Sequence, residues 1–149
     1  MSSEDVIKVL NSLIHVTQDG REGFVEAAGH ATDAGLKNMF MQCSQECAEA
    51  ADELCLTVKT LGGDPARQGS VAGAAHRGWI KLKSAVADSN AVVLEEVERG
   101  EGHARSAYAK ALKLVLPPAI RLLVERQSQG VTRTHQQVRH LREQYRAAA

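Results

Sequence analysis

The sequence predicts an all-α protein, a four-helix bundle, and three observations lead to this fold class. Four segments carry small or apolar residues at spacings that alternate between three and four, which keeps one face of a helix turned inward. Glycine and proline interrupt the chain between these segments. The 149 residues suffice for one core, so we expect a single domain over residues 1–149.

The first two segments predict an antiparallel pair of helices. Ser3 is the expected N-cap of the first helix and Asp33 that of the second. The stretch GGDP, Gly62 to Pro65, should end the second helix, because glycine accepts a left-handed conformation and proline cannot continue a helix. The inward positions are Val6, Leu10, Leu13, Thr17, Gly20, Phe24, Ala27 and Ala31, then Leu36, Phe40, Cys43, Cys47, Ala50, Leu54, Thr57 and Leu61.

The last two segments predict a second antiparallel pair. The stretch LPP separates them, and Pro118 suits the first turn of a helix. An average period of 3.5 residues predicts closely aligned helices with a slight left-handed crossing. The inward positions are Val93, Val97, Gly100, Ala104, Ala107, Ala111 and Leu114, then Ile120, Val124, Gln127, Val131, Thr134, Val138, Leu141 and Tyr145.

A longer connection, Gly63 to Asn90, joins the two pairs. It contains a shorter amphipathic helix, Val71 to Val86, with Ser70 as its expected cap. This helix is long enough to carry the chain back along most of the bundle, so the third long helix should run parallel to the second. Ferritin-like folds with one long crossover have this arrangement.

Several stretches together resemble a bacterial family of ferritin-like four-helix bundles that carries a domain of unknown function. They are the opening DVIKVLNSLIHVTQDGREGF, then GSVAGAAHRGWIKLKSAV, ERGE and LPP, and the most specific part is HRGW. The resemblance covers nearly the whole chain and implies the fold, but no established reaction. The recurring positions of the family match Gly20, Phe24, Gly62, His76, Arg77, Trp79, Glu98, Gly100, Glu101 and Tyr108.

A ferritin-like di-metal site needs glutamates from two helices and a Glu-x-x-His pair from each of the other two. The sequence has no Glu-x-x-His, although it has overlapping Glu-x-x-Glu pairs at Glu95, Glu98 and Glu101 and another at Glu46 and Glu49. Glu98 and Glu101 flank the inward positions, so we expect them outside the core and prefer no metal cofactor. Iron or manganese is the alternative, with candidate ligands Glu22, Glu53, Glu98, Glu101, Glu125 and His135.

A second group of residues forms an interaction or structural signature: His76, Arg77, Trp79, Glu98 and Glu101. In the structural interpretation Trp79 covers the bundle while His76 and Arg77 bond helix ends or carboxylates. In the functional one the HRGW segment and nearby lysines recruit an anionic ligand or partner. Three polar residues at inward positions are expected to fix register, with ligand binding as the alternative: Thr17, Gln127 and Thr134.

Charge and composition exclude several functions. Residues 1–62 hold ten acids and four bases, net −6, and residues 63–149 hold eight acids and fourteen bases, net +6, which two acidic helices beside two basic ones explain. Only five aromatic residues are present, so we expect no nucleic-acid partner. Three cysteines are expected to be small core residues in a reduced compartment. The acidic opening MSSEDV and the lack of a long apolar run predict a cytoplasmic protein with no membrane partner.

No nucleophile elbow, phosphate loop or dinucleotide fingerprint is present. Our preferred hypothesis is a non-enzymatic bundle that acts by contact with itself, as a homo-oligomer, or with an unidentified protein. We expect a stress setting, as ferritin-like relatives often have. The alternative is a metal-dependent oxidoreductase or metal store. A third hypothesis is that the crossover helix covers a pocket for a fatty or aromatic small molecule.

Overall fold

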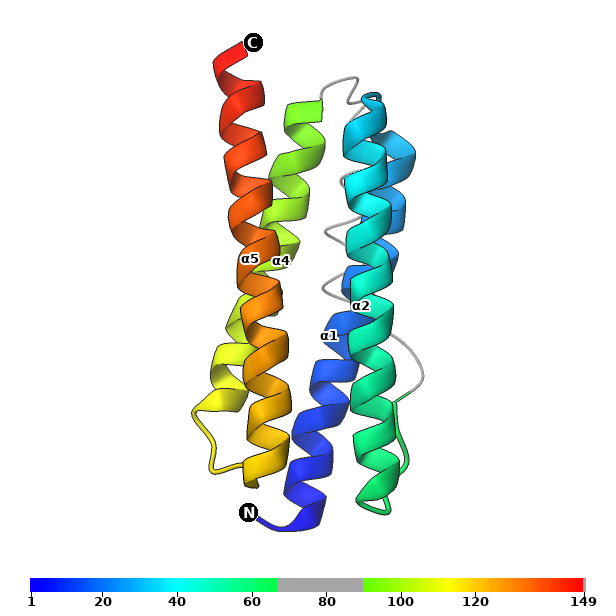
Figure 1. Cartoon of the computed structure of the whole chain (residues 1–149), viewed down its shortest axis with the longest axis vertical. Coiled ribbons are helices and arrows are strands. Elements are labelled where there is room, and N and C mark those ends of the chain that lie inside the picture. The colour runs from blue at the N-terminus through cyan, green and yellow to red at the C-terminus, as the bar shows by residue number, and fades with distance from the viewer. Residues whose placement is uncertain (67–89, 149) are drawn as a thin grey trace.

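The computed structural model describes residues 1–66 and 90–148, and its four helices form an elongated bundle (Figure 1). They are α1 (Ser3–His30), α2 (Ala34–Thr60), α4 (Asn90–Leu112) and α5 (Pro118–Ala148). The predicted all-α four-helix bundle is confirmed. The expected shorter helix between Val71 and Val86 lies outside the described residues.

The directions of the helices follow from the connections. Short links join α1 to α2 and α4 to α5, so each pair is an antiparallel hairpin, and α2 and α4 run in the same direction (Figure 1). Around the bundle the order is α2, α1, α4, α5, and the packing is least extensive between α2 and α5. Among these helices none has the length and hydropathy that a membrane span requires.

The N-terminal caps are local and specific. Asp33 Oδ1 accepts hydrogen bonds from the backbone N–H of Gly35 at 2.7 Å and of Leu36 at 3.2 Å, as predicted. On α1 the cap is Ser2 and not Ser3. The Asp5 N–H donates to Ser2 Oγ at 3.2 Å, and the Ser2 N–H donates to Asp5 Oδ2 at 3.1 Å. This reciprocal pair needs an acid three residues after the cap, which only Ser2 has.

The predicted end of α2 is confirmed at Gly62, which has a φ of 82°. The Gly62 N–H donates to the Lys59 carbonyl and the Gly63 N–H to the Val58 carbonyl, both at 2.9 Å. These two bonds satisfy carbonyls that the end of a helix leaves free, and the left-handed backbone between them favours glycine.

The core is divided into two apolar clusters, one toward each end of the bundle. The upper core, at the top of Figure 1, contains Phe24, Ala27, Ala28, Ala31, Leu36, Phe40, Cys43, Val93, Leu94, Val97 and Val138. The lower core contains Val6, Leu10, Leu13, Ile14, Leu54, Val58, Tyr108, Ala111, Leu116, Ile120 and Val124. The buried polar residues of the described chain lie between the two cores in sequence and form a middle layer: Thr17, Ser44, Glu101, Gln127 and His135.

Candidate functional site

Glu101 is buried in the middle layer, so the prediction that it lies outside the core is wrong. Its exposed fraction is 6%, and the inward face of α4 runs from Val97 through Glu101 to Tyr108. The alternating pattern predicts a step of three residues from Val97 to Gly100, whereas the helix turns Glu101, four positions after Val97, toward the core. Spacing alone does not decide between these steps.

The environment of Glu101 disfavours its charge. Burial, together with the negative charge of Glu46, raises the pKa of the Glu101 carboxyl to about 8. Within the described part of the chain, this carboxyl has no hydrogen bond and no ion pair. At pH 7 it is therefore mostly protonated.

The other glutamates that we considered as metal ligands do not converge on Glu101. Glu98 Oε2 lies 2.9 Å from Arg142 Nε, and these two largely buried atoms form an ion pair without hydrogen-bond geometry. Glu125 Oε1 lies 3.0 Å from Arg121 Nε, one turn away on the same helix. Glu22 is exposed, as predicted. These carboxylates therefore serve as ion-pair partners or face solvent.

His135, the candidate imidazole ligand, is buried in the middle layer. Its Nδ1 lies 3.3 Å from Arg105 Nη1. Burial and the positive charge of Arg105 lower the pKa of the imidazole, so it is neutral and can accept from the guanidinium. Among residues 1–66 and 90–148 no three His, Cys, Asp or Glu side chains are placed to hold a metal ion together, so this part of the chain does not fit a ferritin-like di-metal centre.

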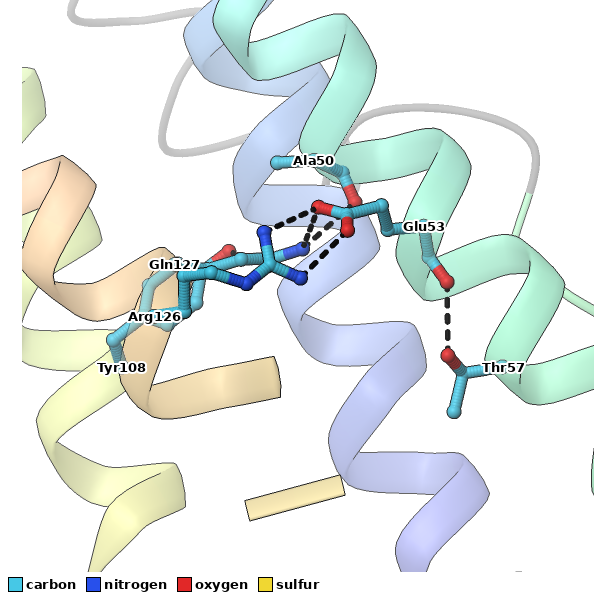
Figure 2. Close-up of polar contacts among 6 residues, drawn as sticks. All are labelled: Ala50, Glu53, Thr57, Tyr108, Arg126 and Gln127. Atoms are coloured by element: carbon cyan, nitrogen blue, oxygen red, sulfur yellow. Dashed lines mark hydrogen bonds and ion pairs between the residues drawn. The ribbon is translucent and has the colours of Figure 1, made fainter. Parts of the chain in front are cut away.

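A polar network links three helices across the middle layer (Figure 2). The Tyr108 hydroxyl on α4 donates to Gln127 Oε1 on α5 at 2.8 Å, and Gln127 Nε2 donates to the Ala50 carbonyl on α2 at 3.2 Å. Arg126 Nη2 donates to Glu53 Oε2 at 2.7 Å, which lowers the pKa of the Glu53 carboxyl. Gln127 was predicted as a polar inward residue, and its bonds span the gap where α2 and α5 pack least.

A pocket of about 340 Å³ lies beside this network. Its interior carries the polar side chains of Thr17, Glu101, Tyr108 and Gln127. The exposed residues of its lining are all on α2 and α5, which shows that it opens between these helices: Glu46, Glu49, Arg126 and Arg133. No local pattern in the sequence predicts this pocket, because its formation depends on the spacing between helices that are distant in sequence.

Two thiols also line the pocket. Burial raises the pKa of the Cys43 thiol to about 12, and it raises the pKa of the Cys47 thiol further. Both thiols are therefore protonated, and they pack as small core residues as predicted. A Cβ on Gly20 would lie 3.0 Å from Cys47 Sγ, so the absence of a side chain there lets α1 approach α2 closely.

The surface around the pocket mouth, which we call the α2/α5 face, combines charge with exposed leucine. Leu56 and Leu122 are 66% and 67% exposed. Each lies about one helical turn from the ion pair between Glu53 and Arg126, on the side toward the lower core. Its exposed charged residues at the pocket mouth are acidic on α2 and basic on α5: Glu46 and Glu49, then Arg126 and Arg133.

The remaining signature residues, His76, Arg77 and Trp79, lie outside the described residues, and so does their expected contact with carboxylates. The partner of Glu98 in the described chain is Arg142, a contact that no pattern in the sequence predicts.

The family of the chain follows from its sequence. Residues 5–114 match the model of a family described as a domain of unknown function, DUF2383. The chain belongs to this family. This confirms the family resemblance predicted from the sequence. None of the curated proteins matches the DUF2383 chain.

Two solved structures share the fold of the DUF2383 chain. One is a two-domain protein from Anabaena variabilis that contains DJ-1/ThiJ/PfpI-like and ferritin-like domains, with a TM-score of 0.80 and 11% identity over 100% of this chain. This chain spans 39% of the length of that protein. The other is a mutant of Dps1 from Mycobacterium smegmatis, with a TM-score of 0.74 and 15% identity over 94% of this chain and 98% of that one. These similarities establish a ferritin-like fold.

Proposed function

We propose that this chain acts by contact with a second copy of itself through the α2/α5 face. The observation that carries the proposal is the pattern on that face, where an acidic helix lies beside a basic helix and each has an exposed leucine near the same end. This pattern is complementary to itself. A surface with that property is what a symmetric dimer requires.

The pattern fits one symmetry in particular. A two-fold axis parallel to the helices, placed between the two copies, lays α2 of one copy over α5 of the other. Glu46 and Glu49 then face Arg133 of the second copy, because the acidic and basic stripes exchange places. The same axis keeps heights along the bundle unchanged, so Leu56 meets Leu122 of the second copy.

The leucines contribute a modest part of the association energy. Fully burying a leucine stabilises by roughly 1.5–3 kcal/mol, and about two-thirds of each side chain is still exposed. Four leucines in a symmetric dimer would thus contribute about 4–8 kcal/mol. Since association costs several kcal/mol of lost freedom, the dimer should depend on the opposing charges as well.

Sedimentation velocity over a range of protein concentrations tests the proposal. We expect the full chain to dimerise and Leu122→Glu to shift it to monomer, because the substitution places an acid against Leu56 of the other copy. Val25→Glu is the matched control, since Val25 is 47% exposed on α1, the helix diagonally opposite α5. A monomer at every concentration, or equal effects of both substitutions, contradicts the proposal.

A charge exchange sharpens the test. Glu49→Arg and Arg133→Glu should each weaken the dimer, and the double substitution should restore it, because the acidic and basic positions have then exchanged places. Circular dichroism of each variant controls for folding. If the double variant is folded but stays monomeric, the proposed pairing of Glu49 with Arg133 of the second copy is wrong.

The di-iron or di-manganese alternative has less support. Among its candidate ligands, only Glu101 and His135 are buried in the core. The carboxylates of Glu53, Glu98 and Glu125 form ion pairs with arginines instead. Elemental analysis of protein purified without chelator distinguishes the two. Near-stoichiometric metal that is lost on Glu101→Ala would reverse the ranking. A non-enzymatic role, a stress setting and a cytoplasmic location stay predictions.

A further inference from the structure

We propose that the pocket beneath the α2/α5 face binds a small organic cation, an ammonium group on an apolar chain, with the Glu101 carboxylate as its counter-ion. The proposal goes beyond self-association, because it assigns a ligand site to the interior of each single chain. It rests on the shape of the pocket, on the deeply buried Glu101 carboxyl, which has no partner in the described chain, and on the charges around the pocket mouth.

The pocket has the size and lining of a small-molecule site. Its volume of about 340 Å³ is within the range of ligand pockets, and such pockets combine apolar walls with a few polar groups. Phe24, Ala104 and Val131 supply apolar wall suited to a hydrocarbon chain. The opening between α2 and α5 leads from solvent to this interior.

Glu101 is the polar group that a ligand would satisfy. Its polar neighbours are already bonded: Tyr108 donates to Gln127, Gln127 donates to the Ala50 carbonyl, and Thr17 Oγ1 donates to the Ile14 carbonyl at 2.9 Å. Glu101 is 6% exposed and has no partner within residues 1–66 and 90–148. A buried polar group without a partner is costly, and an ammonium donor would give this carboxylate a charge-assisted hydrogen bond.

The charges around Glu101 favour a cation over an anion. Arg126 is bound to Glu53, so the unpaired charges of the lining are the carboxylates of Glu46 and Glu49 against the guanidinium of Arg133. This excess of negative charge should attract a cation to the mouth and repel an anion. The other titratable groups near the site are Arg21 on α1, Cys43 and Cys47 on α2, and Tyr108 on α4.

Binding of an ammonium ion should be linked to loss of a proton. Below a pH of about 8 the free Glu101 carboxyl is mostly protonated, whereas the cation binds its ionised form. Affinity should therefore rise with pH, about tenfold per pH unit, and level off above a pH of about 8, until the amine itself loses its proton near a pH of about 10. A neutral ligand that accepts from the protonated carboxyl would show the opposite trend.

Isothermal titration calorimetry of the full chain with three six-carbon probes tests the proposal. We expect hexylammonium to bind at least tenfold more tightly than hexan-1-ol and hexanoate to bind least. At pH 7, buffers with different ionisation enthalpies should reveal the release of close to one proton. The same titrations should be repeated on Leu122→Glu, the variant expected to stay monomeric, in which no second copy covers the pocket mouth. Binding by this variant would support the ligand site whether or not the unaltered chain dimerises.

Two variants locate the site. Glu101→Gln should lower the affinity for hexylammonium at least tenfold and remove the proton release, while hexan-1-ol is unaffected. Glu95→Gln, an exposed carboxylate on the same helix that does not line the pocket, is the matched control and should leave the affinity unchanged. Glutamine resembles the protonated acid in size and charge, so the fold should be retained, and circular dichroism checks this.

Several results would overturn the proposal. They are an affinity for hexan-1-ol equal to that for hexylammonium, an affinity for hexylammonium that falls from pH 6 to pH 8, and unchanged binding in folded Glu101→Gln. Absence of saturable binding by all three probes would overturn it as well. The pH series uses the unaltered chain, so it remains decisive if a variant fails to fold.

Discussion

Replacing Glu101 with glutamine should stabilise the folded chain, and the gain should increase with pH. The carboxyl is 6% exposed and lacks a partner in the described residues, so its ionised form is disfavoured in the folded state. Glutamine has nearly the same volume and hydrogen-bonding groups as the protonated acid but no proton to lose. The substitution therefore removes the cost of ionisation and leaves the packing in place.

The magnitude follows from the difference between the folded and unfolded pKa. The folded pKa is about 8 and the ordinary value is 4.5. Between them the unfolded chain releases a proton that the folded chain keeps, so the free energy of unfolding falls by about 1.4 kcal/mol per pH unit. The gain from Glu101→Gln should be near zero at pH 4, about 3 kcal/mol at pH 7 and about 5 kcal/mol above pH 8. At pH 7 this corresponds to a rise in Tm of about 10 °C.

Urea denaturation followed by circular dichroism at several pH values measures this gain. The difference between variant and unaltered chain at each pH is the relevant quantity, because it cancels the titration of other groups. Glu95→Gln is the matched control, since it removes an exposed carboxylate on the same helix outside the pocket lining, and its effect should be much smaller than that of Glu101→Gln at pH 8. A constant difference for Glu101→Gln, or a loss of stability at pH 7, would refute the assignment of a buried, unpartnered carboxyl.

Three further predictions concern stability measured by the same method. Tyr108→Phe should cost about 1–2 kcal/mol, because it leaves the buried Oε1 of Gln127 without its 2.8 Å hydrogen bond. Gly62→Ala should cost about 1–2 kcal/mol at its φ of 82°, whereas Gly29→Ala, which meets no atom within 4 Å, should stabilise by about 0.5–1 kcal/mol. Arg142→Met should lower the free energy of unfolding by about 2 kcal/mol, because it leaves the largely buried Glu98 carboxylate without its ion-pair partner.

Each of these predictions has a result that would contradict it. If Tyr108→Phe costs as much in a Gln127→Leu background as alone, the hydrogen bond is not the cause. Equal effects at Gly62 and Gly29 would exclude the left-handed conformation as the reason. For Arg142→Met, an added Glu98→Gln should recover most of the loss, and no recovery would exclude the ion pair.

Much of the fold could be predicted from local patterns. The period of apolar residues defined four helices, and the ends at Gly62 and Pro118 follow from the backbone properties of these two residues. The cap of α1 lies at Ser2, one residue before the predicted Ser3, because both are serines and only Ser2 has an acid, Asp5, three residues later to complete a capping box. Helix ends and caps, which depend on residues close together in the chain, can thus be predicted from the sequence.

The site was less predictable, because it depends on contacts between distant residues. Glu53 and Arg126 are 73 residues apart, and no spacing rule pairs them. Glu101 was misplaced because steps of three and four both keep a helix face inward, and its polarity favoured the outward assignment. The signal that could have corrected this is Tyr108, which follows Glu101 by seven residues, two full helical turns, and is fully buried.

The separation of the two apolar cores by the middle layer has an evolutionary consequence. Most of the buried hydrocarbon that holds the helices together lies toward the two ends of the bundle. Outside the hydrogen-bonded network of Tyr108 and Gln127, mutations at the waist should therefore cost less stability than mutations in either apolar core. Within this family, the two ends should maintain the shape of the bundle, while the waist positions that recur, Glu101 and Tyr108, should set what its interior can accommodate.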